Sequence, residues 1–398
     1  MKSGNLPVIQ LKNEDSKEIT PGPRATLLIG GDFCPLRHYE EKLLQGKPIL
    51  TERLGQLFHS HDFTLINLEA PLCAPDLPTL SPGGFGLRCD PAIARSLKDM
   101  GIHAAGLANN HILDYRAKGL FQTVEALEKN SIRHAGAGRN LEEAERPLEI
   151  TLNGLRIGIW ILAEKELNCA GSDTPGSSFF SPDRNLPRIG EMRKKYDFLI
   201  LYVHAGHEFT DTPSPRIRSA FRSFIHAGAD LVIGHHPHVI QGMEAYEGGW
   251  IAYSLGNLLF DSDYVSACRN TEYSFMLSMT VRKHALERLE AIPCKMLKHY
   301  QADRLDGEEA EQVSSDFIRY SSVLADDSLH SRAWERNIRK RWQEEYHPIF
   351  RNFSFNFFNP ENPDYALRTG NLFTCPTHLE MLQEICRMFQ EGKLKREK

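Results

Sequence analysis

Short apolar runs alternate with amphipathic stretches along most of this chain. Each run is rich in Leu, Ile, Val or Ala and ends at a glycine or a polar residue, which is typical of a buried strand that leads into a loop. We expect such strands at 25–29, 63–68, 103–108, 156–162, 197–203 and 231–233, and a strand with a turn at 250–257. Strands that alternate with helices predict an α/β fold.

Helical patterns lie between several of these runs and carry capping residues at their starts and glycines at their ends. We expect helices at 90–101, 115–129 and 215–228. Residues 272–281 alternate between apolar and polar, which predicts a half-buried antiparallel strand. The stretches 73–89 and 164–190 contain Pro and Gly and predict long loops.

The pattern changes from about Gln301 onward, where charged helical stretches appear at 307–325 and 328–346. The last helix is expected to start at Thr377, with Glu380 completing a capping box. The chain is therefore predicted to have three parts: a loose arm (1–23), an α/β domain (24–300) and a helical C-terminal extension (301–398). This extension packs on the core or binds a partner, although a solvated helical face is the simpler interpretation.

Side chains able to bind a metal ion follow the predicted strands. Three histidines occur within four positions in the segment Gly234–Val239, and the spacing of His236 and His238 directs both rings to one side of an extended backbone. The same order, a strand and then a metal-type residue, recurs at four other strand ends: Asp32, Glu69, Asn110 and His204. Taken singly, Asp32 is equally well explained as a helix cap and Asn109 and Asn110 as loop residues.

Taken together, two carboxylates, one amide and three imidazoles suit one or two divalent metal ions, with Mn, Zn and Fe as the candidates. Two ions roughly 3.5–4 Å apart activate a water and stabilise the charge of a phosphoryl transition state. In such a site His111 would protonate the leaving group or stabilise an oxyanion. Asp114, three residues later, would hydrogen-bond the imidazole and fix its tautomer.

Composition narrows the functional classes. The 398 residues are 41% hydrophobic and 25% charged, which is ordinary for a soluble globular protein with a sizeable core. A net charge of -5 argues against binding to nucleic acid. The eight cysteines form no CxxC pair, which fits reduced thiols better than a disulfide scaffold. No apolar stretch has the length of a signal peptide or a membrane span, so we expect a cytoplasmic location without an integral membrane segment.

Six segments carry the candidate residues in collinear order between about residues 25 and 285. They are Gly31-Asp32, Asn67-Leu68-Glu69-Ala70-Pro71-Leu72, Leu107-Ala108-Asn109-Asn110-His111 with Asp114-Tyr115, His204-Ala205-Gly206-His207-Glu208, Gly234-His235-His236-Pro237-His238-Val239 and Tyr253-Ser254-Leu255-Gly256-Asn257. This set resembles the bacterial CapA (PgsA) capsule-biosynthesis family, which belongs to the calcineurin-like metallophosphoesterase superfamily. The resemblance implies a four-layer αββα sandwich of two mixed sheets with the metal site at the sheet ends.

The resemblance also implies roles for single residues. Asp32 matches the first-motif aspartate, and Glu69 stands where the superfamily has its metal-bridging aspartate. Asn110 and His111 match the Asn-His pair of the third motif. His204, His236 and His238 match the remaining histidine ligands, with His235 as the alternative to the preferred His236. A group of neighbours is expected to bind substrate or support the ligands: Asn67, Asn109, His207, Glu208, His235 and Asn257.

One position departs from the superfamily pattern, because its first motif reads Asp-x-His and no histidine lies two residues from Asp32. His38 is a possible substitute, although a loop residue is the simpler interpretation. Two functions follow. The first is a metal-dependent hydrolase that cleaves a phosphoester or a γ-glutamyl-type amide. The alternative is a non-catalytic accessory protein of poly-γ-glutamate or capsule polymer synthesis. The partner is an anionic small molecule or polymer in both cases.

Overall fold

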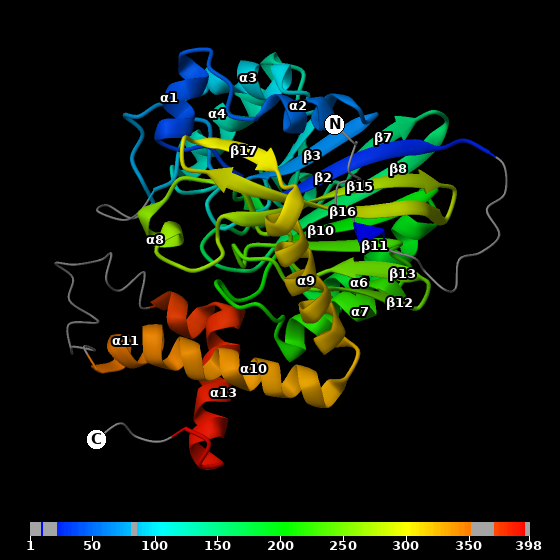
Figure 1. The fold of residues 1–398 in the computed structure, drawn as a ribbon. Coiled ribbons are helices and arrows are strands. Elements are labelled where there is room, and N and C mark those ends of the chain that lie inside the picture. The colour runs from blue at the N-terminus through cyan, green and yellow to red at the C-terminus, as the bar shows by residue number, and fades with distance from the viewer. Residues whose placement is uncertain (1–8, 11–21, 81–85, 352–369, 395–398) are drawn as a thin grey trace.

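The computed structural model describes residues 9–10, 22–80, 86–351 and 370–394 (Figure 1). Its larger sheet contains nine strands: β1 (Ile9–Gln10), β2 (Ala25–Cys34), β3 (Phe63–Leu68), β4 (Ala104–Gly106), β5 (Arg133–Ala135), β14 (Asn257–Phe260), β15 (Tyr273–Arg282), β16 (Ala285–Leu297) and β17 (Gln301–Arg304). The order is β1-β16-β15-β2-β3-β4-β5, with β14 beside β2 and β17 beside β16. Strands β14, β2, β3, β4 and β5 run parallel, and the others pair antiparallel.

The second sheet contains six strands: β7 (Leu148–Leu152), β8 (Leu155–Ala163), β10 (Phe198–His204), β11 (Leu231–His235), β12 (Met243–Tyr246) and β13 (Gly249–Ala252). Its order is β12-β13-β11-β10-β8-β7, with a parallel centre and one antiparallel strand at each edge. A short separate pair joins β6 (Ala137–Gly138) and β9 (Gly176–Ser177).

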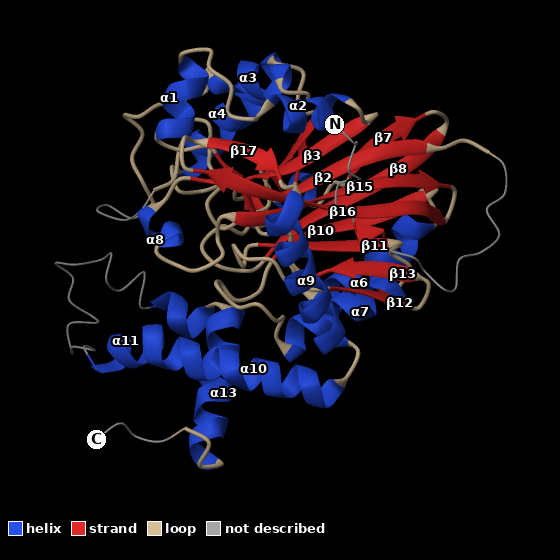
Figure 2. Ribbon diagram, viewed as in Figure 1, coloured by secondary structure: helices blue, strands red, loops and turns tan. Residues whose placement is uncertain are grey.

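Helices cover the outer faces of both sheets (Figure 2). The larger sheet packs on α1 (His38–Leu44), α2 (Glu52–His59), α3 (Ile93–Asp99) and α4 (Arg116–Lys129). The smaller sheet packs on α6 (Pro182–Arg193) and α7 (Pro215–His226). A third apolar cluster lies between the sheets and takes residues such as Leu27 and Leu65 from one and Ile159 and Ile200 from the other. The predicted α/β fold with four αββα layers is therefore confirmed.

The C-terminal part is helical and contains α9 (Gly307–Leu324), α10 (Asp327–Arg341), a π-helix (Trp342–Tyr346), α11 (His347–Arg351) and α13 (Pro376–Gln390). Helix α9 packs on the core through Val313 and Phe317. Helices α10 and α13 share a small core of their own, with Trp334 and Met381 among its buried members. The boundary between residues 300 and 301 stays a prediction. Two short helices, α5 (Leu141–Ala144) and α8 (Asp263–Ser266), complete the described elements.

Several expected elements have different limits in the structure. Strand β2 does not stop at Gly30-Gly31 but continues to Cys34, because β14 runs beside it and a Cβ on Gly31 would meet the carbonyl oxygen of Gly256. The stretch 164–190 is not all loop, since α6 begins at Pro182. The strand expected over 250–257 is divided into the end of β13 and the start of β14.

The capping box of the last helix is wrong: Cys375 is the N-cap without a side-chain hydrogen bond, and the Glu380 carboxylate accepts hydrogen bonds from Ser214 and Arg216 instead. Among the described residues, we find no helix with the length and apolar character needed to cross a bilayer.

Candidate metal centre

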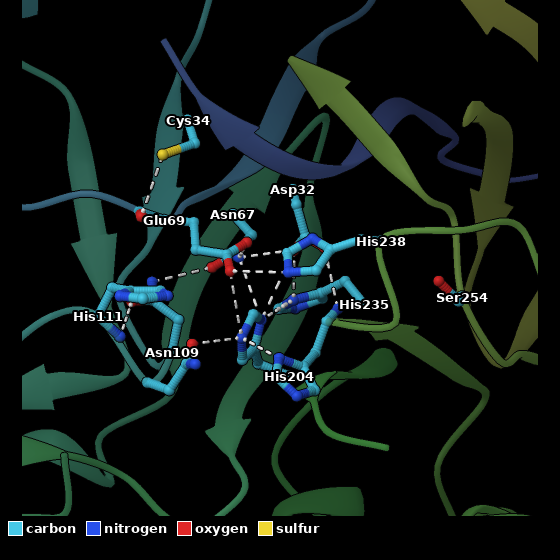
Figure 3. Close-up of polar contacts among 12 residues, drawn as sticks. Asp32, Cys34, Asn67, Glu69, Asn109, His111, His204, His235, His238 and Ser254 are labelled. Carbon is cyan, nitrogen blue, oxygen red and sulfur yellow. Dashed lines mark hydrogen bonds and ion pairs between the residues drawn. The ribbon is translucent and has the colours of Figure 1, made fainter. Parts of the chain in front are cut away.

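The candidate ligands come from both sheets and meet at the edge where the parallel strands end (Figure 3). Asp32 lies near the end of β2, Glu69 follows β3, and Asn110 follows β4. On the smaller sheet, His204 is the last residue of β10 and pairs in register with His235 of β11. Parallel strands therefore deliver oxygen ligands from one sheet and nitrogen ligands from the other.

Asp32 is fully buried and contacts four histidines, including His238, whose Nδ1 lies 3.5 Å from Oδ2. Its Oδ1 lies 3.2 Å from Nδ1 of His235 and 3.6 Å from Nδ1 of His204. Its Oδ2 accepts a hydrogen bond of 3.0 Å from the backbone N–H of His236. The side-chain amide of Asn67 donates to Oδ1 at 2.8 Å, which holds the carboxylate in place. Asp32 is thus oriented from both sheets.

Glu69 faces two imidazoles across a gap that suits a cation. Its Oε1 is buried, forms no hydrogen bond, and lies 3.7 Å from Nε2 of both His204 and His238. Nδ1 of His238 lies 2.9 Å from Oδ1 of Asn257, and since an amide oxygen only accepts, His238 carries its proton there and presents a lone pair at Nε2. The Oδ1 of Asn110 also lies 2.9 Å from Nε2 of His204. Carboxylate and amide oxygens and imidazole nitrogens therefore converge in one buried space.

Electrostatics favour the same interpretation. Burial and the neighbouring Asp32 raise the pKa of Glu69 well above its usual value. Burial also opposes ionisation of Asp32, but hydrogen bonds from His204 and His235 outweigh it and lower the pKa of Asp32. Burial lowers the pKa of His204 to about 3 and also lowers the pKa of His235 and His236, so these imidazoles are neutral at neutral pH. Neutral imidazoles beside two buried carboxylates form a donor set for divalent metal.

Four overlapping groups of three side chains bring their ligand atoms within 4.8 Å of one another in the described part of the chain. The groups are Asp32–His204–His235, Glu69–His204–His236, Asp32–Glu69–His238 and Glu208–His236–His238. Every residue predicted as a carboxylate or histidine ligand occurs in at least one group. His235 and Glu208, predicted as supporting residues, occur as well. The residues present fit divalent metal, and the geometry leaves its identity open.

The histidine loop after β11 has an unusual backbone. His236 has a φ of 101° and His238 a φ of 58°, so both non-glycine residues lie in the left-handed region. The carbonyl oxygen of Pro237 between them accepts a hydrogen bond from the backbone N–H of Phe209 at 2.8 Å. Such strained residues concentrate at functional sites, where the surrounding structure holds them in place.

His111 lies beside the ligand cluster with Asp114 behind it. Nδ1 of His111 and Oδ2 of Asp114 are 2.8 Å apart. Burial lowers the pKa of His111, but the Asp114 carboxylate outweighs this effect and raises the pKa above its usual value. The backbone N–H of His111 donates to Oδ1 of Asn109 at 3.2 Å. The arrangement favours a protonated imidazole whose Nε2 is directed away from Asp114.

The position of the missing first-motif histidine is occupied by Cys34. Its Sγ donates to the backbone carbonyl of Glu69 at 3.4 Å and lies outside the ligand cluster (Figure 3). Burial raises the pKa of this thiol well above its usual value, which disfavours a thiolate ligand. His38 is no substitute, because it lies in α1, where it contacts Asp261 at 2.9 Å and stacks on Tyr300.

The two predicted supporting residues in the turn after β10, His207 and Glu208, point in different directions. Glu208 lies with His236 and His238 and accepts a hydrogen bond of 3.1 Å from the Tyr264 hydroxyl. The ring of His207 packs instead against Trp334 of α10, and its Nε2 lies 3.0 Å from the carbonyl oxygen of Thr377. His207 therefore connects the centre to the C-terminal helices.

A cavity of about 200 Å³ lies between this turn and the C-terminal helices. His236, Glu208, His207 and Glu166 line one side. The other side, here called the C-terminal wall, consists of Arg341, Glu345, Tyr346, Asn371, Cys375, Thr377 and His378. The sequence interpretation missed Glu166 and the wall. Glu166 follows the end of β8 and so shares the strand-then-polar pattern, whereas the wall gave no local signal.

A buried ion network holds the wall in place. The Arg216 guanidinium donates two hydrogen bonds of 3.1 Å to the Glu164 carboxylate and one of 3.0 Å to Glu380 of α13. It also donates to the Thr377 hydroxyl at 2.9 Å. The backbone N–H of Glu164 in turn donates to the carbonyl of His204 at 2.7 Å. Helix α13 is thus tied to the strand ends that carry the centre.

Residues 26–262 match the family described as "Bacterial capsule synthesis protein PGA_cap". The chain is 30% identical over 268 residues to the PGA biosynthesis protein CapA of Bacillus subtilis (strain 168), which covers 66% of this chain and 69% of that protein. It is 28% identical over 281 residues to the capsule biosynthesis protein CapA of Bacillus anthracis, covering 68% and 67%. A solved 5′-nucleotidase precursor from Thermus thermophilus aligns with a TM-score of 0.40 and 11% identity, covering 75% of this chain and 58% of that one.

Proposed function

Because this chain belongs to the bacterial capsule synthesis protein family PGA_cap, we propose that it is a metal-dependent hydrolase of a phosphoester or a γ-glutamyl-type amide. The observation that carries the proposal is the buried, unpartnered Oε1 of Glu69, which faces imidazole nitrogens of His204 and His238 at 3.7 Å. An unpaired buried carboxylate oxygen is costly unless a cation satisfies it. A divalent metal at this position would satisfy it.

The ligand roles follow from the atoms that converge. Asp32, Glu69 and Asn110 would offer oxygens, and His204, His236 and His238 would offer nitrogens. One or two divalent ions, when bound, would activate a water and neutralise the negative charge of the transition state. Asn67 holds the carboxylate of Asp32 through its side-chain amide, and Asn257 fixes the tautomer of His238.

His111 is the proton donor in this proposal. Asp114 accepts from Nδ1 and orients the ring, so the proton to be transferred is held at Nε2. The oxygen of water bonds to the phosphorus or the carbonyl carbon, the bond to the leaving group breaks, and His111 gives its proton to the departing oxygen or nitrogen. The proton that the water releases then restores the protonated form of His111. Asn109 supports this geometry, because its Oδ1 accepts from the backbone N–H of His111.

A second candidate function is a non-catalytic accessory role in capsule polymer synthesis, in which the same pocket binds an anionic polymer. The observation that favours it is Cys34, which replaces the first-motif histidine and directs its thiol to a backbone carbonyl rather than to the ligand cluster. The smaller donor set would support binding with fewer ions. The oriented His111–Asp114 pair favours hydrolysis, since binding alone needs no oriented acid.

The test combines metal content with turnover. Elemental analysis of the purified full chain should find one or two divalent ions per chain, and adding Mn should raise turnover of an aryl phosphate or a γ-glutamyl anilide. Asp32→Asn should lose both the metal and the turnover while its circular dichroism is unchanged. Metal-free protein that hydrolyses either substrate as fast as the loaded protein would contradict the proposal. Bound metal with polymer binding and no turnover would instead support the accessory role.

A further inference from the structure

The cavity between the metal centre and the C-terminal wall contains more negative than positive charge. Glu166 and Glu208 both line it. Neither carboxylate forms an ion pair within the ranges that the structure describes; Glu208 accepts from the Tyr264 hydroxyl, and Glu166 accepts a long bond of 3.4 Å from Asn371. The Arg341 guanidinium of the wall is already paired with Glu345. The cavity therefore has two carboxylates that form no ion pair, and the Arg341 guanidinium divides its electrostatic interaction between Glu345 and Glu208.

A buried histidine beside the cavity carries an unpaired acceptor. His207 lines the same cavity and is 4% exposed. Its Nε2 contacts the carbonyl oxygen of Thr377, which only accepts, so the ring proton is at Nε2. Burial lowers the pKa of His207 well below its usual value, so the ring is neutral and Nδ1 carries a lone pair. This Nδ1 is buried without a hydrogen-bond partner.

The arrangement does not fit a further metal ion. Among the described residues, no group of three ligand side chains within 4.8 Å includes Glu166 or His207. The acceptors are instead spread around a space of about 200 Å³, smaller than the roughly 300–1,000 Å³ of a typical small-molecule site. A space of this size suits one end of a ligand, and an ammonium group offers three donors and one positive charge to such a lining.

We propose that this cavity binds a primary ammonium group of the substrate, while the scissile group of the same molecule lies at the metal centre next to His236. The inference rests on the proposed function and adds the substrate class: a small zwitterion, or the amino end of a larger molecule. Glu166, from the loop after β8, is the residue that selects the ammonium. The C-terminal wall, outside the family-matched residues 26–262, closes the far side of the space.

The test compares ligands that differ only in the amino group. Aminoalkyl phosphates of two to five carbons and the matching alkyl phosphates are titrated calorimetrically into Mn-loaded full-length protein. At one chain length the amino ligand should bind about tenfold more tightly, as expected for a charge-assisted hydrogen bond. Glu166→Gln should remove this preference, and Glu166→Asp should retain it at a longer chain length. Glu344→Gln, an exposed neighbour of the wall that does not line the cavity, should leave it unchanged.

The outcomes separate the two proposals. Equal affinities of amino and plain ligands at every length, or a preference that survives Glu166→Gln, would overturn the inference alone. An additional Mn equivalent that is lost in Glu166→Gln would also overturn it, because the cavity would then be a metal site. Wild-type protein that binds none of Mn, Zn and Fe would contradict the proposed function, and this inference with it.

Discussion

The two sides of the cavity beside His236 are built from different parts of the chain. One side is formed by His236 and its neighbours at the metal centre, whose candidate ligands follow parallel strands of both sheets and lie within the family-matched residues 26–262. On the other side is the C-terminal wall, all of whose residues come after position 340. The candidate metal ligands and the residues of the opposite wall thus come from separate parts of the chain. We infer that the chemistry and the selecting carboxylate of Glu166 reside in the family core, and that the extension completes the cavity around the bound group.

The two sides are also held differently. The ligand residues sit at the ends of hydrogen-bonded strands between large apolar clusters, and unfolding them would require opening a sheet. The wall depends on a small core around Trp334 and on the network centred on Arg216. Elements with fewer buried contacts open at lower free energy than the global core. The wall should therefore be separable from the metal centre by substitution.

Glu69→Gln should have the largest effect, because it removes the charge that faces the imidazoles. Turnover should fall by at least about 100-fold and metal content should drop, as for the loss of a ligand and its charge. In contrast to turnover and metal content, the stability of the metal-free protein should not fall. The raised pKa of Glu69 means that ionisation opposes folding, so wild-type stability decreases as pH rises from the unfolded-state pKa toward the folded-state pKa.

The substitution removes this ionisation, so metal-free Glu69→Gln should match or exceed wild type in urea denaturation at pH 8. The difference should shrink below about pH 4, where Glu69 is protonated in both states. Asn67→Ala is the matched control, since it removes a neutral neighbour that donates to Asp32 and Glu69. A metal-free variant much less stable than wild type at pH 8 would show that the Glu69 side chain does not destabilise the metal-free fold.

The metal-centre side could be predicted from the sequence because the pattern that marks it is local in the chain. A strand of the right period followed directly by Asp, Glu, Asn or His places that side chain at a sheet edge, whichever strand is its neighbour. This pattern predicts His204 and Glu69 as site residues without reference to their partners. The pattern does not predict which way a side chain points within a turn. His207 and Glu208 are adjacent, but His207 packs on α10 and Glu208 lies with His236 and His238.

The C-terminal wall could not be predicted from the sequence because its contacts join residues that are far apart along the chain. Glu380 appeared to cap its own helix with Thr377, yet both side chains bond to Arg216, more than 160 residues earlier. Local spacing predicts the local partner whenever no tertiary partner is visible. A similar error affected Gly30-Gly31, which suggested a turn but accommodates the close approach of β14. Both errors occurred where a neighbour distant in sequence determined the role of a residue.

Asp114→Asn tests the proposed acid separately from the metal ligands, because Asp114 contacts His111 and is not itself a predicted ligand. Turnover should fall by about 10- to 100-fold, as for the loss of an orienting carboxylate. Asp114 raises the pKa of His111, so the protonated form needed for catalysis should be lost at lower pH in the variant. The alkaline limb of the pH–rate profile should therefore move toward lower pH, while metal content stays at the wild-type value. An unchanged alkaline limb would exclude His111 as the acid that limits turnover.

Glu380→Gln should produce the smallest effect and act on the wall alone. It removes a charge from the Arg216 network, and the neutral amide still accepts a hydrogen bond, so local opening of α13 should become easier by about 1–3 kcal/mol. Hydrogen exchange of the α13 amides should speed up while β10 and β11 are unaffected. KM should rise a few-fold with kcat unchanged, because a looser wall weakens binding and leaves the acid and the ligands in place. Glu391→Gln is the control: it changes surface pairs with Arg387 and Lys393 at the end of the same helix, and such pairs contribute little. A Glu380→Gln protein that loses metal or kcat would show instead that the wall and the metal centre form one cooperative unit, joined through Glu164 and His204.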